Sequence, residues 1–461
     1  MEGTHDFLID DGFILKGYTG KEEAVVIPDG VSIISRGAFK DSKSLSSISF
    51  PKSIRFIEEQ AFINCIGLKS VIFPDHLEKI KSDASTPHLC IFAKAFEGCT
   101  QLEKIAIPSY VSSLREKAFC SCSRLKEVSF SNRNMEIALN AFDGTSAWTI
   151  QDGFRTIDGI CFGYEGEERA VSIPTSIERI LDCAFRSNSE IQQVSIPGTI
   201  CTVPERAFFH CPSLKSIKLE DGVKSIQHLA FAWNEQLESI TLSGTTQLLS
   251  AAFSDCESIK QISIPEGIQE IGQNTFYKCT GLERINIPNS LKIIGPGAFE
   301  YCLSLSSLPE LNQVEIIGEW AFAGCDGLTS ITLNDHVKQI NYRAFGSCSS
   351  LRKVHISEKV ESCGEELFVN CEALETIIAP CHIIKSLTNM QKMIACKSFL
   401  SNRNEYSQDQ QKKWSTYIRR SYKKLILFLA DNKAEEEMKL LVSILNLPTD
   451  VLESYTTEAC D

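Results

Sequence analysis

The sequence of 461 residues contains 8 histidines and 19 cysteines, side chains suited to acid–base, nucleophilic and metal chemistry near neutral pH. Two histidines, His76 and His336, each follow an aspartate at the same phase of an internal repeat. An Asp-His pair could hold an imidazole in place for general base catalysis. No nucleophile stands at a fixed distance from either pair, so we interpret both histidines as polar turn residues.

Metal binding would require two to four ligands that converge, commonly from local spacings of two to four residues. The local candidates are Cys120 and Cys122, separated by one residue, and the adjacent pair Cys381 and His382. Neither provides a full set of ligands, so we predict no metal and no cofactor. The sequence also lacks the phosphate-binding glycine loop, the Gly-x-Gly-x-x-Gly pattern and the His-Glu-x-x-His pattern. We therefore predict that the protein is not an enzyme.

Charge and hydropathy exclude further classes of protein. The net charge is −13 at pH 7, and a protein that binds nucleic-acid phosphates needs a basic surface, so we predict no nucleic-acid ligand. No run of 18 apolar residues is present, which argues against a membrane association through a spanning helix. Residues 1–6 show no basic start, and no apolar stretch of a secretory signal follows them. We expect a cytoplasmic protein, with the cell surface or secretion as the alternative.

A recurring phenylalanine sets the register of most of the chain. Of the thirteen intervals between these fourteen phenylalanines, ten are 23 residues, one is 22, and those of 34 and 43 residues contain insertions. Twelve of the phenylalanines follow an alanine, and ten precede a cysteine by three residues. Self-similarity at this period predicts a solenoid. The phenylalanines are Phe39, Phe62, Phe96, Phe119, Phe142, Phe185, Phe208, Phe231, Phe253, Phe276, Phe299, Phe322, Phe345 and Phe368.

The unit at residues 275–288 shows how each repeat should fold. Residues 282–287 alternate between apolar and polar, which predicts a short, half-buried strand that Pro288 ends. We expect Gly295 to permit a tight turn before the next phenylalanine. Each unit is too small to bury its apolar residues alone, so stacked neighbours should form one column of Phe, Leu and Ile. The cysteines at their common phase should be buried, reduced thiols.

The residues of this repeat resemble a known family. The pattern Ile-Pro-x-x-Ile-x-x-Ile-Gly-x-x-Ala-Phe-x-x-Cys-x-x-Leu stands nearly intact at residues 264–282 and 287–305. It is similar to the BspA-type leucine-rich repeat, and the resemblance covers roughly residues 25–380. The resemblance implies a leucine-rich repeat fold and binding without chemistry, because proteins of this family are often surface or secreted adhesins that bind host or matrix proteins.

Turn signals and loss of the period divide the chain. Asp11-Gly12, between apolar runs, predicts a hairpin that caps the solenoid, and residues 163–174 repeat the pattern of residues 17–28. We predict an α/β repeat solenoid, a right-handed superhelix of about fourteen 23-residue units with a small α-helical C-terminal tail. The predicted parts are a hairpin cap at 1–30, repeats at 31–151, a second hairpin cap at 152–174, repeats at 175–385 and a helical tail at 386–461.

The tail should contain an amphipathic helix. Trp414, Ile418 and Leu425 recur at helical spacing and form an apolar stripe. Six cations cluster on the same segment, at Lys412, Lys413, Arg419, Arg420, Lys423 and Lys424. This segment could lie on an anionic membrane or in the groove of a partner. We favour a solvated basic face whose apolar stripe packs on the last repeat as a cap.

Two strand positions, eight and ten residues after each phenylalanine, should face a ligand. Outside the Phe142 unit, 13 of these 26 residues are Ser or Thr, which could be β-compatible filler or a hydrogen-bonding surface for a protein or glycan. Larger side chains that interrupt the pattern are the candidate contacts. They are Lys104, Glu127, Lys218, Arg284, Lys353 and His355. We predict a protein-binding scaffold that grips its ligand along the strands, or alternatively an adhesin for host or matrix proteins or glycans.

Overall fold

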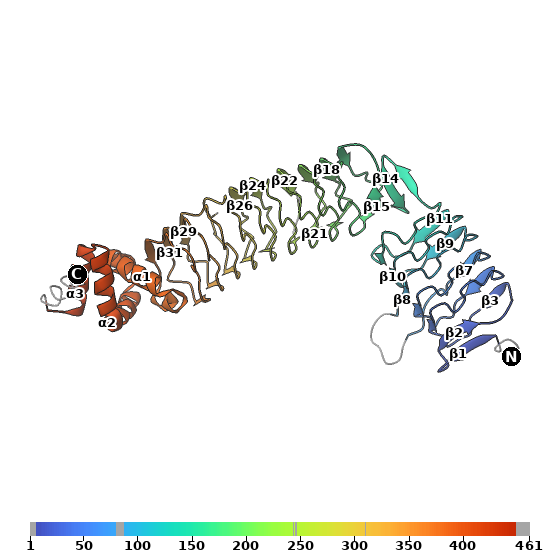
Figure 1. Cartoon of the computed structure of the whole chain (residues 1–461), viewed down its shortest axis with the longest axis horizontal. Coiled ribbons are helices and arrows are strands. Elements are labelled where there is room, and N and C mark those ends of the chain that lie inside the picture. The colour runs from blue at the N-terminus through green and yellow to red at the C-terminus, as the bar shows by residue number, and fades with distance from the viewer. Residues whose placement is uncertain (1–5, 80–86, 243, 245–246, 309, 449–461) are drawn as a thin grey trace. The chain divides into compact units, whose positions relative to one another are not determined.

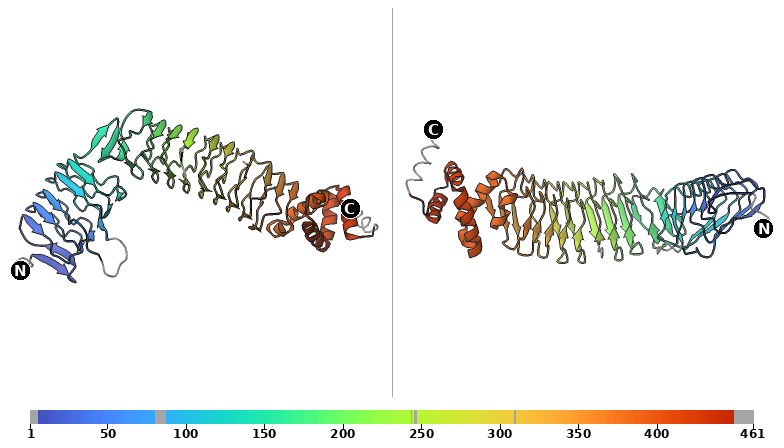
Figure 2. Two further views of the ribbon diagram at one scale, coloured as in Figure 1. Left: turned by 180° about the vertical axis from the view of Figure 1, so that it is seen from behind. Right: turned by 90° about the horizontal axis from the view of Figure 1, so that it is seen from below.

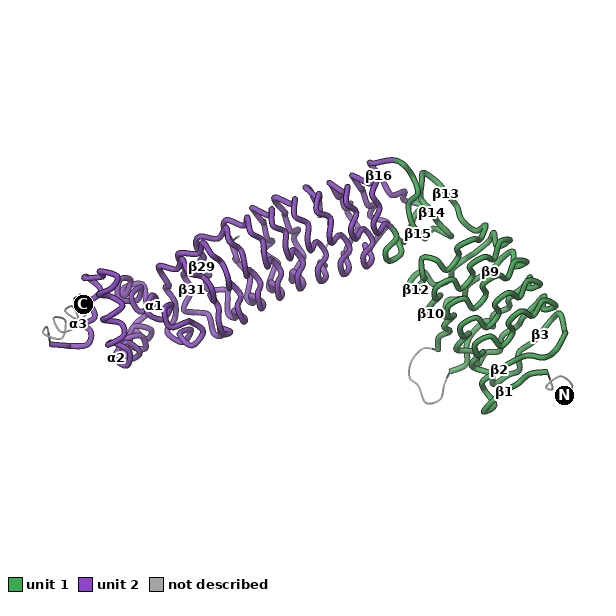
Figure 3. The backbone as a smooth tube through the Cα atoms, in the orientation of Figure 1, with its two compact units in different colours: residues 1–167, 176–184 green, residues 168–175, 185–461 purple. Residues whose placement is uncertain are grey.

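The computed structural model describes residues 6–79, 87–242, 244, 247–308 and 310–448. The repeats form a parallel-strand solenoid in which each turn of the chain, which we call a rung, lies beside the next (Figure 1 and Figure 2). The fold class predicted from the phenylalanine period is confirmed. The chain divides into two compact units, residues 1–167 with 176–184 and residues 168–175 with 185–461 (Figure 3).

Unit 1 contains two sets of short strands, which alternate along the chain. The first set carries the predicted ligand-facing positions, and we call its outward surface strand face 1. It contains β3 (Ala24–Val26), β5 (Ser47–Ser49), β7 (Ser70–Ile72), β9 (Lys104–Ile107) and β11 (Glu127–Phe130). The second sheet contains β1 (Phe7–Asp10), β2 (Ile14–Tyr18), β4 (Ile33–Ile34), β6 (Phe56–Ile57), β8 (Leu89–Ile91), β10 (Val111–Leu114) and β12 (Glu136–Ile137).

Hairpins occur at two places in unit 1. The hairpin predicted from Asp11-Gly12 is present, because β1 pairs with β2 in antiparallel orientation. A second group follows the last rung of this unit and forms one sheet. Its strands are β13 (Thr149–Gln151), β14 (Phe154–Ile157), β15 (Ile160–Tyr164) and β17 (Arg179–Ile180). Asp158 and Gly159 both have positive φ, of 49° and 75°, in the tight turn between β14 and β15.

Unit 2 repeats the arrangement and ends in helices. Its outward strand surface, strand face 2, contains β16 (Ala170–Ser172), β18 (Gln193–Ile196), β20 (Ser216–Leu219), β22 (Ser239–Leu242), β24 (Gln261–Ser263), β26 (Arg284–Asn286), β29 (Ser330–Leu333), β31 (Lys353–Ile356) and β33 (Thr376–Ile378). The other sheet contains β19 (Thr202–Val203), β21 (Ser225–Ile226), β23 (Gln247–Leu248), β25 (Glu270–Ile271), β27 (Ile293–Ile294), β28 (Ile316–Ile317), β30 (Gln339–Ile340) and β32 (Ser362–Cys363).

The repeated phenylalanines form the core of each unit. Successive rings stack nearly parallel, with centroids 5.1 Å apart for Phe96 and Phe119 and 5.7 Å apart for Phe253 and Phe276. Phe276 is fully buried. The predicted phenylalanine column is therefore confirmed, and each ring buries its faces against its neighbours rather than against its own rung.

A column of thiols runs beside the phenylalanines. Each Sγ donates a hydrogen bond to the carbonyl oxygen of the phenylalanine in the preceding rung, over 3.0 Å for Cys65 and 3.3 Å for Cys348. In one rung Asn234 replaces the cysteine, and its Nδ2 donates to the oxygen of Phe208 over 3.0 Å. The predicted burial of these cysteines is confirmed. The column contains Cys65, Cys99, Cys122, Cys211, Cys256, Cys279, Cys302, Cys325, Cys348 and Cys371.

Left-handed residues flank each phenylalanine. The residue two positions after it has positive φ in all fourteen rungs, and the residue two positions before it in thirteen, including Leu229 and Trp320. The expectation for Gly295 is wrong, because its φ is not positive and Gly297 is the left-handed residue of that turn. Gly295 instead allows two rungs to approach closely, since a Cβ there would lie 2.7 Å from the oxygen of Ile271.

The tail contains, in this order, η1 (Cys381–Ser386), α1 (Asn389–Ser401), η2 (Arg403–Glu405), α2 (Gln408–Asp431) and α3 (Glu435–Leu445). Helices α1 and α2 pack on the last rung, and α3 packs on α1 and α2. Side chains of the tail make hydrogen bonds to backbone groups of β33 and of the residues just after it. Ser398 Oγ accepts from the N–H of Ile377 over 3.0 Å, and the Trp414 indole N–H donates to the oxygen of Ala379 over 3.0 Å. The basic side chains of α2 are exposed, whereas Trp414, Ile418 and Leu425 are buried.

Candidate functional site

The two strand faces carry exposed side chains in strict register. In strand face 2, Ser330 of β29 lies opposite Lys353 of β31, and Thr332 lies opposite His355. Between these positions the side chain of Val354 is buried. Alternation of this kind leaves one side chain in two free to contact a ligand, while the other anchors the strand to the core.

The structure brings four of the six predicted residues together in pairs. Lys104 and Glu127 are register partners on β9 and β11 of strand face 1. Lys353 and His355 lie on the same side of β31. All six side chains, including those of Lys218 and Arg284, are exposed.

Lys218 and Arg284 stand apart from each other on strand face 2. Three rungs separate β20 from β26, which corresponds to roughly 14 Å at the usual strand spacing. Lys218 Nζ lies 3.7 Å from a carboxylate oxygen of Glu220 in its own rung. Arg284 donates to the side-chain oxygen of Gln261, its register partner on β24, over 3.3 Å. These two residues do not form a common site.

A hollow of about 660 Å³ lies on strand face 1. Lys104 and Glu127 line it from the strands. The group of strands after the last rung provides its far wall. The other lining residues, which the strand positions alone did not identify, are Lys69, Ser70, Val71, Ile105, Ala106, Lys126, Val128, Ser129, Ala147, Thr149, Ile157 and Asp158.

The hollow has more free positive than negative charge. Among the described residues, the ammonium groups of Lys69, Lys104 and Lys126 have no carboxylate partner within 4.0 Å. The neighbouring Arg124 differs, because it lies 2.6 Å from a carboxylate oxygen of Glu103. Three lysines with unmatched charge on adjacent rungs would favour a ligand that carries carboxylates.

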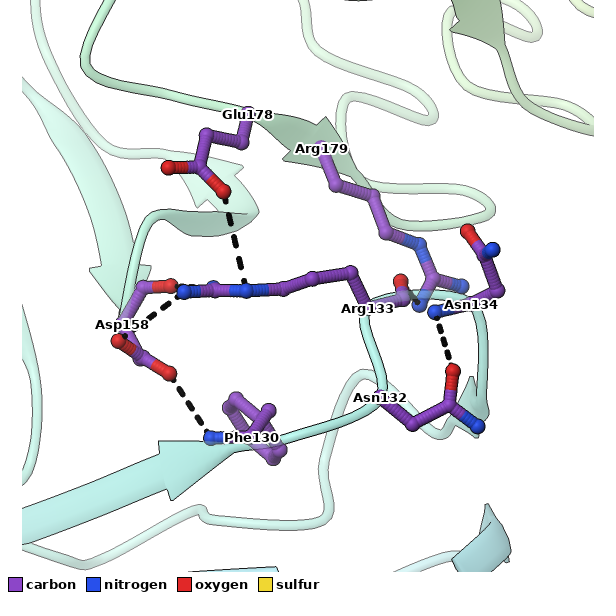
Figure 4. Close-up of polar contacts among 7 residues, drawn as sticks. All are labelled: Phe130, Asn132, Arg133, Asn134, Asp158, Glu178 and Arg179. Atoms are coloured by element: carbon purple, nitrogen blue, oxygen red, sulfur yellow. Dashed lines mark hydrogen bonds and ion pairs between the residues drawn. The ribbon is translucent and has the colours of Figure 1, made fainter. Parts of the chain in front are cut away.

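Asp158 is held at the rim of this hollow by a network of contacts (Figure 4). Its Oδ2 accepts a hydrogen bond from the backbone N–H of Phe130 over 2.8 Å, and its Oδ1 lies 3.3 Å from the guanidinium of Arg133. Arg133 also donates to the backbone oxygen of Asp158 and lies 3.7 Å from Glu178. Arg179 donates to the backbone oxygen of Arg133 over 2.6 Å, and its burial lowers its pKa.

The residues with catalytic potential are not assembled into a site in the described part of the chain. His76 Nδ1 lies 3.0 Å from a carboxylate oxygen of Asp75 on an exposed turn. Burial raises the pKa of Cys65 and Cys211 to about 12, which suppresses thiolate formation at neutral pH. Cys122 belongs to the thiol column and donates to Phe96. No group of three His, Cys, Asp or Glu side chains within the described residues has the arrangement of a metal site.

None of the helices in the described ranges combines the length and the apolar character that crossing a membrane requires.

Solved structures of bacterial leucine-rich repeat proteins are similar to this chain. A protein from Bacteroides ovatus is 25% identical, covering 81% of this chain and 94% of its own, with a TM-score of 0.39. One from Eubacterium ventriosum is 16% identical over 69% and 91%, with a TM-score of 0.38. A leucine-rich cell surface protein from Faecalibacterium prausnitzii is 22% identical over 77% and 94%, with a TM-score of 0.25. Comparison with curated protein sequences gives no match.

A family model gives the assignment. The model of the BspA type leucine rich repeat region matches residues 17–86, 90–212, 155–283 and 269–396, which together span most of the chain. These ranges contain the phenylalanine and cysteine columns and both strand faces. The chain therefore belongs to the family of BspA-type leucine-rich repeat proteins.

Proposed function

We propose that the protein is a non-enzymatic scaffold that binds a protein ligand along the strand faces of its repeats. It belongs to a family of leucine-rich repeat scaffolds that typically bind proteins and are generally not enzymes. The observation that carries the proposal is the hollow on strand face 1, where Lys104 and Glu127 lie side by side. The exposed Lys218, Arg284, Lys353 and His355 supply further contacts on strand face 2.

Charge-reversal variants test this function. We would capture partners from the source cells with the full chain and compare it with Lys104→Glu and Glu127→Lys. Because these side chains would contact the ligand directly, we expect Lys104→Glu to weaken binding of the captured protein at least tenfold, and Glu127→Lys, which adds positive charge to the hollow, to strengthen the binding of a ligand that carries carboxylates. The matched control is Lys117→Glu, which makes the same charge change at an exposed turn outside strand face 1. Equal binding by all four proteins would contradict the proposal. Binding of the chain to a glycan array, with no protein captured, would contradict it as well.

The protein could act as a scaffold in the cytoplasm or as an adhesin at the cell surface, and its location distinguishes these two functions. We propose the cytoplasm, supported by the cysteines that the structure describes, all of which are free thiols. The alternative is an adhesin at the cell surface. Fractionation of the source cells, combined with protease treatment of intact cells, distinguishes them. Protection from the protease with recovery in the cytosol supports the scaffold, whereas removal by the protease or recovery from the medium supports the adhesin.

A further inference from the structure

Backbone hydrogen bonds join the parallel strands of each face from one rung to the next. The residue eleven positions after the phenylalanine donates its N–H to the following rung, as Phe50 does to the oxygen of Ile72 over 3.0 Å. Ile264 does the same to Asn286 over 2.9 Å. Each strand therefore needs a successor to satisfy one of its two edges.

The last strand of strand face 1 has no successor in its sheet. β11 pairs with β9 on one side only, and β11 stands at the end of the sheet. Phe130 is the residue of β11 that would donate to the next rung. Its N–H donates instead to Oδ2 of Asp158, so a side-chain carboxylate replaces the missing backbone carbonyl (Figure 4).

Val128 is the other residue whose backbone faces this open edge. The N–H groups of Glu127 and Ser131 donate to the rung of β9, to Glu103 and Ile107. Because backbone groups alternate in direction along a parallel strand, the N–H and C=O of Val128 point away from β9, as the N–H of Phe130 does. Within the part of the chain that the structure describes, neither group of Val128 has a hydrogen-bond partner on that side.

The end of strand face 2 shows how this fold closes such an edge. Ile377 of β33 is nine residues after its phenylalanine, as Val128 is, and its N–H donates to Ser398 Oγ over 3.0 Å. The N–H of Ala379 donates to the hydroxyl oxygen of Tyr406 over 3.2 Å. An open strand edge can pair with another strand. The side chains of the tail occupy this edge at β33, whereas the edge of β11 at Val128 stays open.

The open edge of β11 borders the hollow of about 660 Å³. Val128 lines it from the strand, and Ala147, Thr149 and Ile157 line it from the group of strands that follows. An extended segment of three residues, opposite Lys126 to Val128, would span about 10 Å and end before Phe130, whose N–H already donates to Asp158. Lys126 lies beside the start of β11, whereas Lys104 and Lys69 lie one and two rungs further from the open edge, so the three ammonium groups line the same hollow across the strands.

We propose that this hollow binds an acidic, extended peptide segment of a partner protein as an added parallel or antiparallel strand beside β11. The inference rests on the proposed protein-binding function and specifies its ligand class. The N–H and C=O of Val128 supply main-chain hydrogen bonds, which are independent of the side chains of the peptide. Lys126, whose rung borders the added strand, supplies the preference for carboxylates, and Lys104 and Lys69 extend the same positive charge across the hollow, since Asp158 is already engaged by Arg133.

Replacement of Val128 tests the hydrogen bonds directly. Proline lacks an N–H and is tolerated where a strand edge faces outward, so Val128→Pro removes the donor to the hollow without removing a bond to β9. Val128→Thr, which keeps the N–H, is the matched control. The probe is a library of random twelve-residue peptides displayed on phage and selected on the full chain. We expect enriched peptides to be rich in Asp and Glu, and to bind Val128→Pro at least tenfold more weakly than Val128→Thr.

A second measurement does not depend on the folding of the proline variant. Hydrogen exchange of the unaltered chain should show that the Val128 amide becomes protected when the selected peptide binds. N-methylation of alternate peptide amides should weaken binding at least tenfold. Unchanged exchange at Val128, equal affinity of the methylated peptide, or failure to enrich any acidic peptide would each overturn strand addition. If Lys104→Glu abolishes capture of a protein partner while Val128→Pro does not, strand addition fails and strand-face binding stands.

Discussion

The Sγ atom of Cys279 donates a hydrogen bond to the carbonyl oxygen of Phe253, which lies 3.2 Å away in the preceding rung. The same contact recurs along the thiol column, so each cysteine joins two rungs as well as filling the core. Asn234 makes the equivalent bond and two more, to the oxygen of Phe231 over 2.6 Å and from the N–H of Cys211 over 2.8 Å.

Asn234→Cys should therefore be tolerated, because a thiol restores the donor that the other rungs use. Because the thiol does not replace the bond that Asn234 accepts from Cys211, we expect a loss of about 1–2 kcal/mol in the free energy of unfolding, measured by urea denaturation. Asn234→Leu has a similar size but leaves buried backbone groups without partners, and should cost about 3 kcal/mol or more. Equal stability of the two variants would show that the bond to Phe208 contributes little.

Truncation of the phenylalanine column should be costly at any buried rung. Phe276→Ala removes a ring stacked between Phe253 and Phe299, and we expect a loss of roughly 3–5 kcal/mol in urea denaturation. Gln273→Ala, an exposed position in the same rung, is the control and should change stability by less than about 0.5 kcal/mol. A loss below about 1 kcal/mol for Phe276→Ala would contradict the role of the column as the core.

The thiols should differ sharply in reactivity. Burial raises the pKa of Cys65 and Cys211 to about 12, whereas Cys201 is exposed. At pH 8, iodoacetamide should modify Cys201 in the folded protein and spare the column, and peptide mass spectrometry would locate the labels. In concentrated urea all of them should react, which provides the control. Rapid labelling of Cys65 in the folded chain would mean that the column opens readily.

The same burial predicts loss of stability at alkaline pH. The pKa of Cys256 is raised to about 12 in the folded state, and an unfolded thiol titrates near 8.5. The thiol's contribution to folding is therefore complete below about pH 8.5 and is lost progressively as the pH rises toward 12. Between pH 8 and pH 10, the fall in unfolding free energy should be about 2 kcal/mol smaller in Cys256→Ala than in the unaltered chain. Parallel pH profiles would refute this contribution.

Removal of the tail should expose the final rung. A chain that ends at residue 385 loses the partners of Ile377 and Ala379, so we expect it to associate through the edge of β33. Light scattering during size-exclusion chromatography would detect the aggregates. A chain that ends at residue 448 keeps α1, α2 and α3 and should remain monodisperse if the full chain does. A monomeric, equally stable chain of 385 residues would show that the tail is not needed as a cap.

The period of the sequence was sufficient to predict the core, and the reason is physical. A residue type that recurs every 23 positions, such as Phe276 and Phe299, must occupy equivalent places if the turns stack. The alternation around Val354 likewise placed Lys353 and His355 on the outer surface. These predictions used only the apolar or polar character of side chains and their spacing.

Features that depend on backbone contacts between rungs could not be predicted in this way. Leu229 and Trp320 adopt positive φ although neither residue type favours it, at a local cost of roughly 1–2 kcal/mol each. Hydrogen bonds to the next rung hold them, as from the N–H of Trp320 to the oxygen of Tyr342 over 3.0 Å. Asp158 is similar, because only the spatial position of Phe130 reveals what its carboxylate does.

The backbone hydrogen bonds between rungs also repeat with the period of the sequence, some donated to the following rung and some to the preceding one. In twelve of the fourteen rungs the N–H of the core phenylalanine donates to the following turn, as from Phe299 to Ala321 over 2.8 Å and from Phe322 to Ala344 over 2.8 Å. A whole 23-residue module therefore presents to its successor the same set of donors and acceptors that its predecessor presents to it. Duplicating or deleting such a module therefore leaves the bonding balanced, whereas inserting a single residue does not. The length of the solenoid is consequently free to vary in whole modules, without redesign of the parts on either side.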